Sequence, residues 1–186
     1  MASSVPRDDL AGLTRLSCSF PKPDVVSLDG LRHVPGLTSL SLVGTSLSSV
    51  GPADALSRVE HLSLTATGVR DLAPLADLPA LTSLSLGDRC WDTAEPYDLD
   101  ALTEVAALTD LSLSCLDVQD LAPVGRLTGL TQLSLHALPA RDLRPLSSLE
   151  SLTVLVVREM PDVDLRPLRA LPSLRSTVLD GVETSR

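Results

Sequence analysis

The sequence is dominated by one short motif that returns at a nearly constant interval. The hexamer LTSLSL begins at Leu37 and again at Leu81, and related hexamers begin at residues 13, 59, 108, 130, 152 and 174. Successive starts are therefore 24, 22, 22, 27, 22, 22 and 22 residues apart. Fixed periods of roughly 20 to 50 residues are typical of solenoids, in which each repeat packs only against its neighbours. The sequence thus predicts a stack of similar coils.

Each hexamer has the polarity pattern of a β-strand with one buried face. The fourth and sixth positions are apolar, as at Leu40 and Leu42, whereas the third, fifth and seventh positions are mostly small or polar. Alternate residues of a strand point to opposite faces, so the leucines are expected in a core and the polar residues in solvent. Leucine fills 40 positions while Phe, Tyr and Trp occur once each, which indicates an aliphatic core.

A second motif follows the strands and predicts a capped turn. An Asp stands twelve residues after most hexamer starts, with Leu next and usually Pro three residues after the Asp, as in DLAPL at Asp71. The carboxylate can accept free N–H groups at the start of a helical turn, and Pro in the first turn loses no hydrogen bond. A coil of 22 residues has little room for a full helix, so we expect mainly 3₁₀ or extended segments with Leu72, Leu75 and Leu78 pointing inward.

Together the two motifs form the frame LxxLxLxx(x)xVxDLxPLxxL, which resembles the 22-residue class of leucine-rich repeats. This class is familiar from bacterial internalins and from regulators of protein phosphatases, and the resemblance covers nearly the whole chain. It implies an α/β solenoid of horseshoe shape, a single leucine-rich-repeat domain over residues 1–186, with about 7–8 short parallel strands lining a concave face. The family usually has Asn at the ninth repeat position, where this sequence has Thr45, Thr67, Leu116, Leu138 and Met160.

Repeat arrays rich in Pro and Arg also resemble the C-terminal part of bacterial NACHT-type signalling ATPases. The sequence has no G-x-x-x-x-G-K-[ST] phosphate loop, so no ATP site is expected within it. In that setting the resemblance implies that the array recognises a ligand or restrains an attached ATPase.

Composition excludes several kinds of partner. The net charge of −9 opposes binding to nucleic-acid phosphates, which requires clustered Lys and Arg. The first residues lack a secretion signal and no segment reaches about 18 uninterrupted apolar residues, so we expect a cytoplasmic protein without membrane contact. Three cysteines are too few for a disulfide framework or a zinc site. We expect buried or incidental thiols at Cys18, Cys90 and Cys115, and the sequence leaves open whether the last two are free.

The concave face offers candidate binding residues. Its fifth column is a row of serines that changes to Val156 and Val178, and a small polar solvent face is the simplest interpretation. The third and seventh columns vary more, which is typical of a recognition surface, although ordinary solvated surface is the alternative. From these columns we select His61, Asp110, Gln132, His136 and Arg158 as partner-binding candidates.

An insertion lengthens the coil after the fourth strand and carries the only Trp and Tyr. It has the sequence GDRCWDTAEPY and runs from Gly87 to Tyr97. Trp and Tyr are enriched at binding hot spots, and insertions into repeat arrays often carry function. We therefore add Trp91, Tyr97 and Arg89 to the partner-binding candidates; the alternative is that Trp91 merely covers its own coil.

Catalytic and metal sites are not expected. Ser114, His136 and Arg158 should lie side by side, but the third residue is Arg instead of a carboxylate, and a flat sheet offers neither a pocket nor an oxyanion hole. His61 and His136 lie three strands apart, about 14 Å, which is too far for a shared metal ion.

The expected function is a non-enzymatic interaction or ligand-sensing module. Its partner would be a protein or a domain of the same larger protein, with no nucleic acid, membrane or small-molecule cofactor involved. The alternative is a structural or assembly scaffold with an idle concave face. The sequence shows no cap before Leu10 or after Asp180, so we expect a piece of a longer protein or an end buried in an oligomer.

Overall fold

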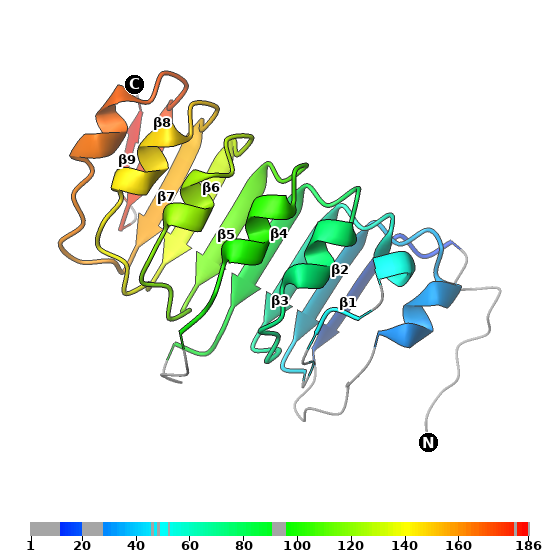
Figure 1. Ribbon diagram of the computed structural model, residues 1–186. Helices are drawn as coiled ribbons and strands as arrows, with labels where there is room; N and C mark the ends of the chain where they lie inside the picture. The colour runs from blue at the N-terminus through cyan, green and yellow to red at the C-terminus, as the bar shows by residue number, and fades with distance from the viewer. Residues whose placement is uncertain are drawn as a thin grey trace.

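The computed structural model of the protein describes residues 12–19, 28–45, 47, 49–51, 53–90, 96–180 and 182–185. Within this part of the chain one sheet contains nine strands in sequence order (Figure 1). The first eight strands are parallel and begin at the third position of each predicted repeat, which confirms all eight predicted strands. The strands are β1 (Arg15–Ser19), β2 (Ser39–Val43), β3 (His61–Thr65), β4 (Ser83–Gly87), β5 (Asp110–Ser114), β6 (Gln132–His136), β7 (Val154–Arg158), β8 (Ser176–Leu179) and β9 (Val182–Ser185).

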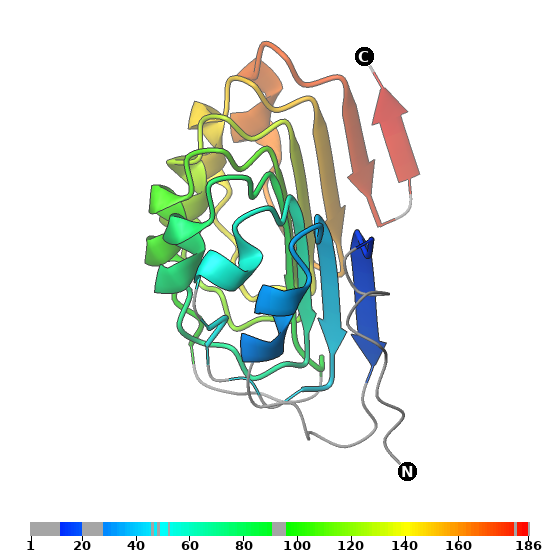
Figure 2. The same cartoon turned by 90° about the vertical axis from the view of Figure 1, so that its right-hand side faces the viewer.

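Short helical turns form a second layer against one face of the sheet (Figure 2). Most are 3₁₀ turns, as predicted, and the one α-helical turn among the described residues, α2, is only four residues long. We call the opposite face of the sheet the concave face. The turns are η1 (Asp29–His33), η2 (Ala53–Leu56), η3 (Ala73–Asp77), η4 (Asp100–Glu104), α2 (Ala122–Gly125), η5 (Arg144–Ser148) and η6 (Arg166–Ala170).

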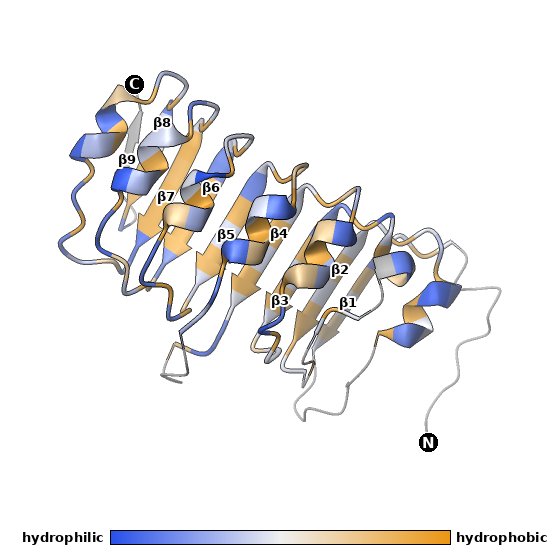
Figure 3. Cartoon of the chain, in the orientation of Figure 1, coloured by the Kyte–Doolittle hydropathy of each residue, from blue (hydrophilic) through white to orange (hydrophobic). Residues whose placement is uncertain are grey.

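The core lies between the two layers and is built from leucine. From β2 to β6 the leucines at the fourth and sixth repeat positions are at most 2% exposed. Leu72, Leu75 and Leu78 are buried at 2%, 0% and 3%, so the predicted inward direction of these side chains is confirmed. Coloured by hydropathy, the strands carry apolar residues while hydrophilic residues gather on the turns and connections (Figure 3). Burial of this continuous apolar layer is the main force that holds the coils together.

The recurring Asp caps the turns as predicted. In five coils its Oδ1 accepts the backbone N–H two residues further on, at 2.8–3.1 Å. In two of these coils an Arg stands two residues after the Asp. The Arg144 guanidinium donates hydrogen bonds to the Asp142 carboxylate and lowers the pKa of that carboxyl to about 2. The five carboxylates belong to Asp71, Asp98, Asp120, Asp142 and Asp164.

Threonine hydroxyls also connect consecutive coils. The Oγ1 atoms of Thr131 and Thr153 each donate to the backbone carbonyl of the equivalent residue one coil earlier, at 3.2 and 2.9 Å, while the single hydroxyl hydrogen of Thr109 is directed to Asp110 at 2.6 Å. The same bond runs from Thr38 to Thr14 and from Thr82 to Glu60. These bonds connect consecutive coils at the start of the strands, where the sequence repeats LT.

A backbone ladder connects the coils at the other end of the strands. The residue after the strand has a positive φ of 51–71° at Gly44, Ala66, Cys115 and Ala137. Each of these four N–H groups donates to the last carbonyl of the next strand at 2.9 Å. The last carbonyl of each of these following strands is therefore satisfied by a main-chain donor.

The C-terminal end departs from the parallel repeat. Residues 182–185 form β9, which pairs antiparallel with β8 and places Val178 opposite Glu183. No helical cap was expected after Asp180, and this added strand, which the repeat did not predict, extends the sheet. The region before Leu10 lies outside the described residues.

Candidate interaction site

The concave face is built from the third, fifth and seventh positions of each repeat. The strand register places Ser85, Ser112 and Ser134 opposite one another in consecutive strands, and Val156 follows in β7. These side chains are half-buried, whereas the leucines between them are buried. The fifth column is therefore polar over β4 to β6 and becomes apolar from β7 on.

A shallow hollow lies over this column of side chains, across β4 to β7. Its volume of about 170 Å³ is well below the roughly 300–1,000 Å³ of pockets that enclose a small molecule. The hollow can accept one protruding side chain of a larger partner. It is lined by Ser83, Leu84, Ser85, Asp110, Leu111, Ser112, Gln132, Leu133, Ser134, Val154 and Val156.

Two of the predicted binding residues meet at this hollow. Asp110 and Gln132 are directly opposite in the pairing of β5 with β6, and both line the hollow. Asp110 is half-buried, and one of its carboxylate oxygens accepts the Thr109 hydroxyl at 2.6 Å. His61 is exposed at the start of β3, where it is opposite Ser83 and not Asp110. Val154 and Val156 were not selected from the sequence, although the change from Ser to Val in the fifth column was the available signal.

The carboxyl ends of the strands bring two further candidates together. Register places His136 between Ser114 and Arg158, as predicted. His136 Nε2 lies 3.4 Å from a carboxylate oxygen of Glu159, while Arg158 is exposed. A carboxylate therefore does contact the histidine, contrary to one step of the argument against a Ser-His site.

Ser114 does not complete such a site. Its Oγ lies against Gly87, where an added Cβ would come within 2.6 Å of it. A nucleophile needs its hydroxyl directed at the base, whereas the Ser114 hydroxyl lies against Gly87 of β4 and His136 belongs to β6.

The insertion is anchored to its neighbours by Tyr97. Its ring is 9% exposed, its hydroxyl donates to the Val69 carbonyl at 2.8 Å, and its N–H donates to the Asp117 carbonyl at 2.9 Å. The Arg70 guanidinium lies 4.8 Å from the ring centroid. Burial raises the pKa of the Tyr97 hydroxyl to about 12. The structure thus places Tyr97 inside the molecule, as the residue that fixes the end of the insertion.

The other candidates in the insertion have different positions. Arg89 is exposed, and its N–H donates to Asp88 Oδ1 at 2.8 Å. Asp88 also forms an ion pair with Arg70, at 3.3 Å. Trp91, the remaining candidate in the insertion, lies outside the described residues.

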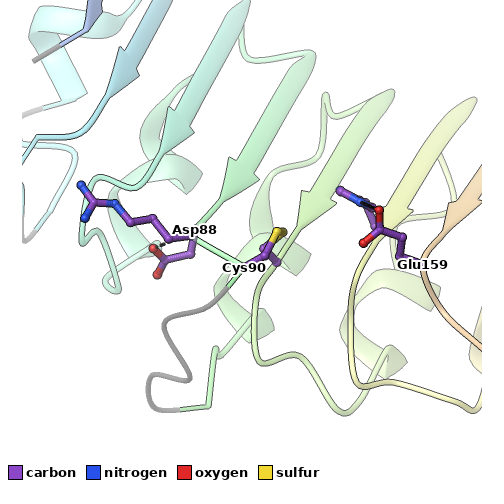
Figure 4. Close-up of a disulfide and its surroundings, with 6 residues drawn as sticks. Asp88, Cys90 and Glu159 are labelled. Carbon is purple, nitrogen blue, oxygen red and sulfur yellow. Dashed lines mark hydrogen bonds and ion pairs between the residues drawn. A yellow bond between two sulfur atoms is a disulfide. The ribbon is translucent and has the colours of Figure 1, made fainter. Parts of the chain in front are cut away.

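A disulfide between Cys90 and Cys115 corrects the interpretation of these cysteines as incidental thiols. Their Cα atoms are 4.6 Å apart, and the bond joins the insertion to the residue after β5 (Figure 4). In the same view Asp88 and Cys90 follow β4, and Glu159 follows β7 further along the same edge of the sheet. Spacing alone could not show the pair, because the two cysteines are 25 residues apart in the sequence. Cys18 is a free thiol in β1.

In the part of the chain that the structure describes, no group of three or more His, Cys, Asp or Glu side chains could hold a metal ion. None of the helices described is long and apolar enough to cross a membrane.

Comparison with solved structures defines the class of fold. The chain is similar to an internalin (InlF) from Listeria monocytogenes, with a TM-score of 0.66 and 24% identity, over 94% of this chain and 56% of the other. Internalin C2 (InlC2) from the same organism gives a TM-score of 0.61 and 23% identity, over 94% and 84% of the two chains. The fold is therefore that of a leucine-rich-repeat horseshoe.

A third similar structure extends the likeness to another genus. A leucine-rich-repeat protein of Leptospira interrogans matches with a TM-score of 0.65 and 18% identity, over 94% of this chain and 45% of that one. The chain thus spans about half the length of two of these three proteins. No protein-family model matches the sequence, and no curated protein matches it.

Proposed function

We propose that this chain is a protein-interaction module that holds its partner on the concave face over β4 to β7. The observation that carries the proposal is the hollow, whose rim combines the carboxylate of Asp110, the amide of Gln132 and the apolar side chains of Val154 and Val156. Mixed polar and apolar surface of this kind is typical of protein interfaces. A hollow of this depth fits one side chain of a polypeptide better than it fits an enclosed small molecule.

The strand ends next to the hollow extend the proposed contact surface. His136, Arg158 and Glu159 supply charges of both signs, and Arg89 adds an exposed guanidinium at the base of the insertion. Charges at the rim of an interface select the partner and guide its approach more than they add affinity. We assign Trp91 to the same surface on its residue type and its place in the insertion.

We extend the proposal to the kind of partner that binds this face. The sequence resemblance to NACHT-type arrays favours another domain of the same longer protein, with the concave face acting in ligand sensing or restraint. A scaffold with an idle concave face is the competing account, and the experiment below separates the two.

The test is affinity capture by matched variants, followed by identification of the captured proteins. Ser112→Arg and Ser134→Arg place a large charge in the hollow, while Ala76→Arg places the same charge on the exposed side of η3. A true partner should be lost by at least about tenfold with either concave variant and retained with Ala76→Arg. Loss with all three variants, or with none of them, would contradict the proposal.

Folding of the three variants is checked first. Far-ultraviolet circular dichroism and urea unfolding should be close to those of the wild type, because all three positions are solvent-facing and none supplies a buried leucine. Differences in capture then report on the surface and not on the fold.

A further inference from the structure

The Cys90–Cys115 disulfide lies at a junction between two kinds of structure. Cys115 is the first residue after β5 and belongs to the regular coil, whereas Cys90 belongs to the insertion. Cys90 is exposed and Cys115 is half-buried. A reagent in solution therefore reaches the disulfide from the side of Cys90.

The regular coil does not need a cysteine at position 115. Cys115 has a φ of 55° and donates its N–H to the His136 carbonyl, and Ala66 and Ala137 do the same at the equivalent positions with a φ of 51°. Alanine thus fills this position in two other coils, after β3 and after β6. The disulfide is an addition to a turn that already forms without it.

The insertion also has anchors that do not involve sulfur. Before Cys90, Asp88 pairs with Arg70; after it, Tyr97 bonds to Val69 and Asp117. These contacts hold both ends of the insertion when the disulfide is open. The described contacts on the two sides of Cys90, at Asp88 and at Tyr97, therefore do not depend on the disulfide.

We propose that Cys90–Cys115 is a redox modification site whose substrate is a dithiol reductant. A thiolate of the dithiol attacks Cys90 Sγ, a mixed disulfide forms, and the Cys115 sulfur leaves as a thiolate that takes up a proton. The second thiol of the reductant then attacks the reductant's sulfur in the mixed disulfide. The Cys90 sulfur leaves as a thiolate that takes up a proton. The protein gains two electrons and two protons, and the reductant becomes a cyclic or protein disulfide.

The state of this disulfide depends on the compartment in which the protein resides. Disulfides persist in oxidising compartments and are reduced in the cytosol. In an oxidising compartment the insertion is tied to β5, and in a reducing one it is held only by Asp88 and Tyr97. The cytoplasmic location expected from the sequence stays a prediction. In that compartment we expect the reduced form of the disulfide.

The test uses the full chain in native buffer with dithiothreitol as the probe. After mild reduction, alkylation and mass measurement should show three modified cysteines, against one before reduction, with an unchanged circular dichroism spectrum. Trypsin should then cut after Arg89 about tenfold faster, relative to the cut after Arg126 in the regular coil. Re-oxidation should restore both the alkylation count and the slow cut.

Two variants keep the test decisive. Cys115→Ala should show the fast cut after Arg89 with or without dithiothreitol, and Cys90→Ser should behave in the same way. Reduction of the two cysteines only when the circular dichroism signal is lost would overturn the proposal, as would an unchanged cleavage ratio in the reduced protein and both variants.

Discussion

The coil from β5 to β6 and the coil from β4 to β5 share β5 but are stabilised differently. The first repeats after 22 residues and the second after 27, a difference of five residues. In the regular coil the Thr131 hydroxyl, the Asp120 cap and the Cys115 N–H make the same bonds as their counterparts in neighbouring coils. Its stability comes from repetition.

The longer coil keeps the cap and adds contacts that occur in it alone among the described coils. Asp98 caps η4 in the usual way, but the segment before it is held by the disulfide and by the buried ring of Tyr97. An insertion into a repeat therefore needs its own contacts, because the repeat supplies none for the extra residues.

The largest expected effect comes from the core that both coils share. Leu135→Ala removes a side chain of 0% exposure in β6 and should lower the free energy of unfolding by about 2–5 kcal/mol, since a cavity is left between rigid layers. Urea unfolding measures the change. Ser147→Ala on the exposed side of η5 is the control, and an equal loss in both variants would contradict the assigned core.

The disulfide comes next and is specific to the longer coil. Cys115→Ala should cost about 2–4 kcal/mol in non-reducing buffer, because the open chain gains entropy in its unfolded state. The loss should vanish when wild type and variant are compared under reduction. A loss that persists under reduction would show that the Cys115 side chain contributes by packing and not through the bond.

Loss of a turn cap should have a smaller effect, and a similar one in both kinds of coil. Asp120→Ala and Asp98→Ala each remove the acceptor of one backbone N–H and should cost about 1 kcal/mol in thermal or urea unfolding. Asp77→Ala, at the exposed end of η3, should cost less than half as much. A much larger loss at Asp98 would mean that the cap also positions the insertion.

The last expected effect concerns the Tyr97 hydroxyl and appears only at high pH. Its pKa is raised from 10.0 to about 12, so the folded state resists its ionisation. The associated stability is fully present below pH 10 and is lost as the pH rises toward 12. Tyr97 is the single tyrosine, so absorbance at the tyrosinate band reports it directly. A midpoint near 10 in the folded protein would contradict its burial.

The repeat made most of the fold predictable. Positions four and six of LTSLSL locate the buried leucines, and the DLxP motif locates the turns, because burial and capping depend on residues close in sequence. The disulfide and the burial of Tyr97 could not be predicted, since both depend on the path of an insertion that follows no repeat. The β9 hairpin was missed because it is antiparallel and lies outside the repeat frame.

The candidate site was predictable in part. The choice of columns found Asp110 and Gln132 at the hollow and His136 beside Arg158. It did not select Val154 and Val156, which line the hollow, because the selection favoured polar side chains.

Site-specific crosslinking tests the central claim, that the concave face over β4 to β7 is the recognition surface, most directly. A photoreactive benzophenone side chain is placed at Gln132 on the concave face and, in a second protein, at Ala76 on η3. Both positions are exposed, so both probes reach solvent equally well. The account predicts a discrete crosslinked polypeptide from Gln132 that Ala76 does not give. A Gln132 probe that captures nothing beyond what the Ala76 probe captures would contradict it.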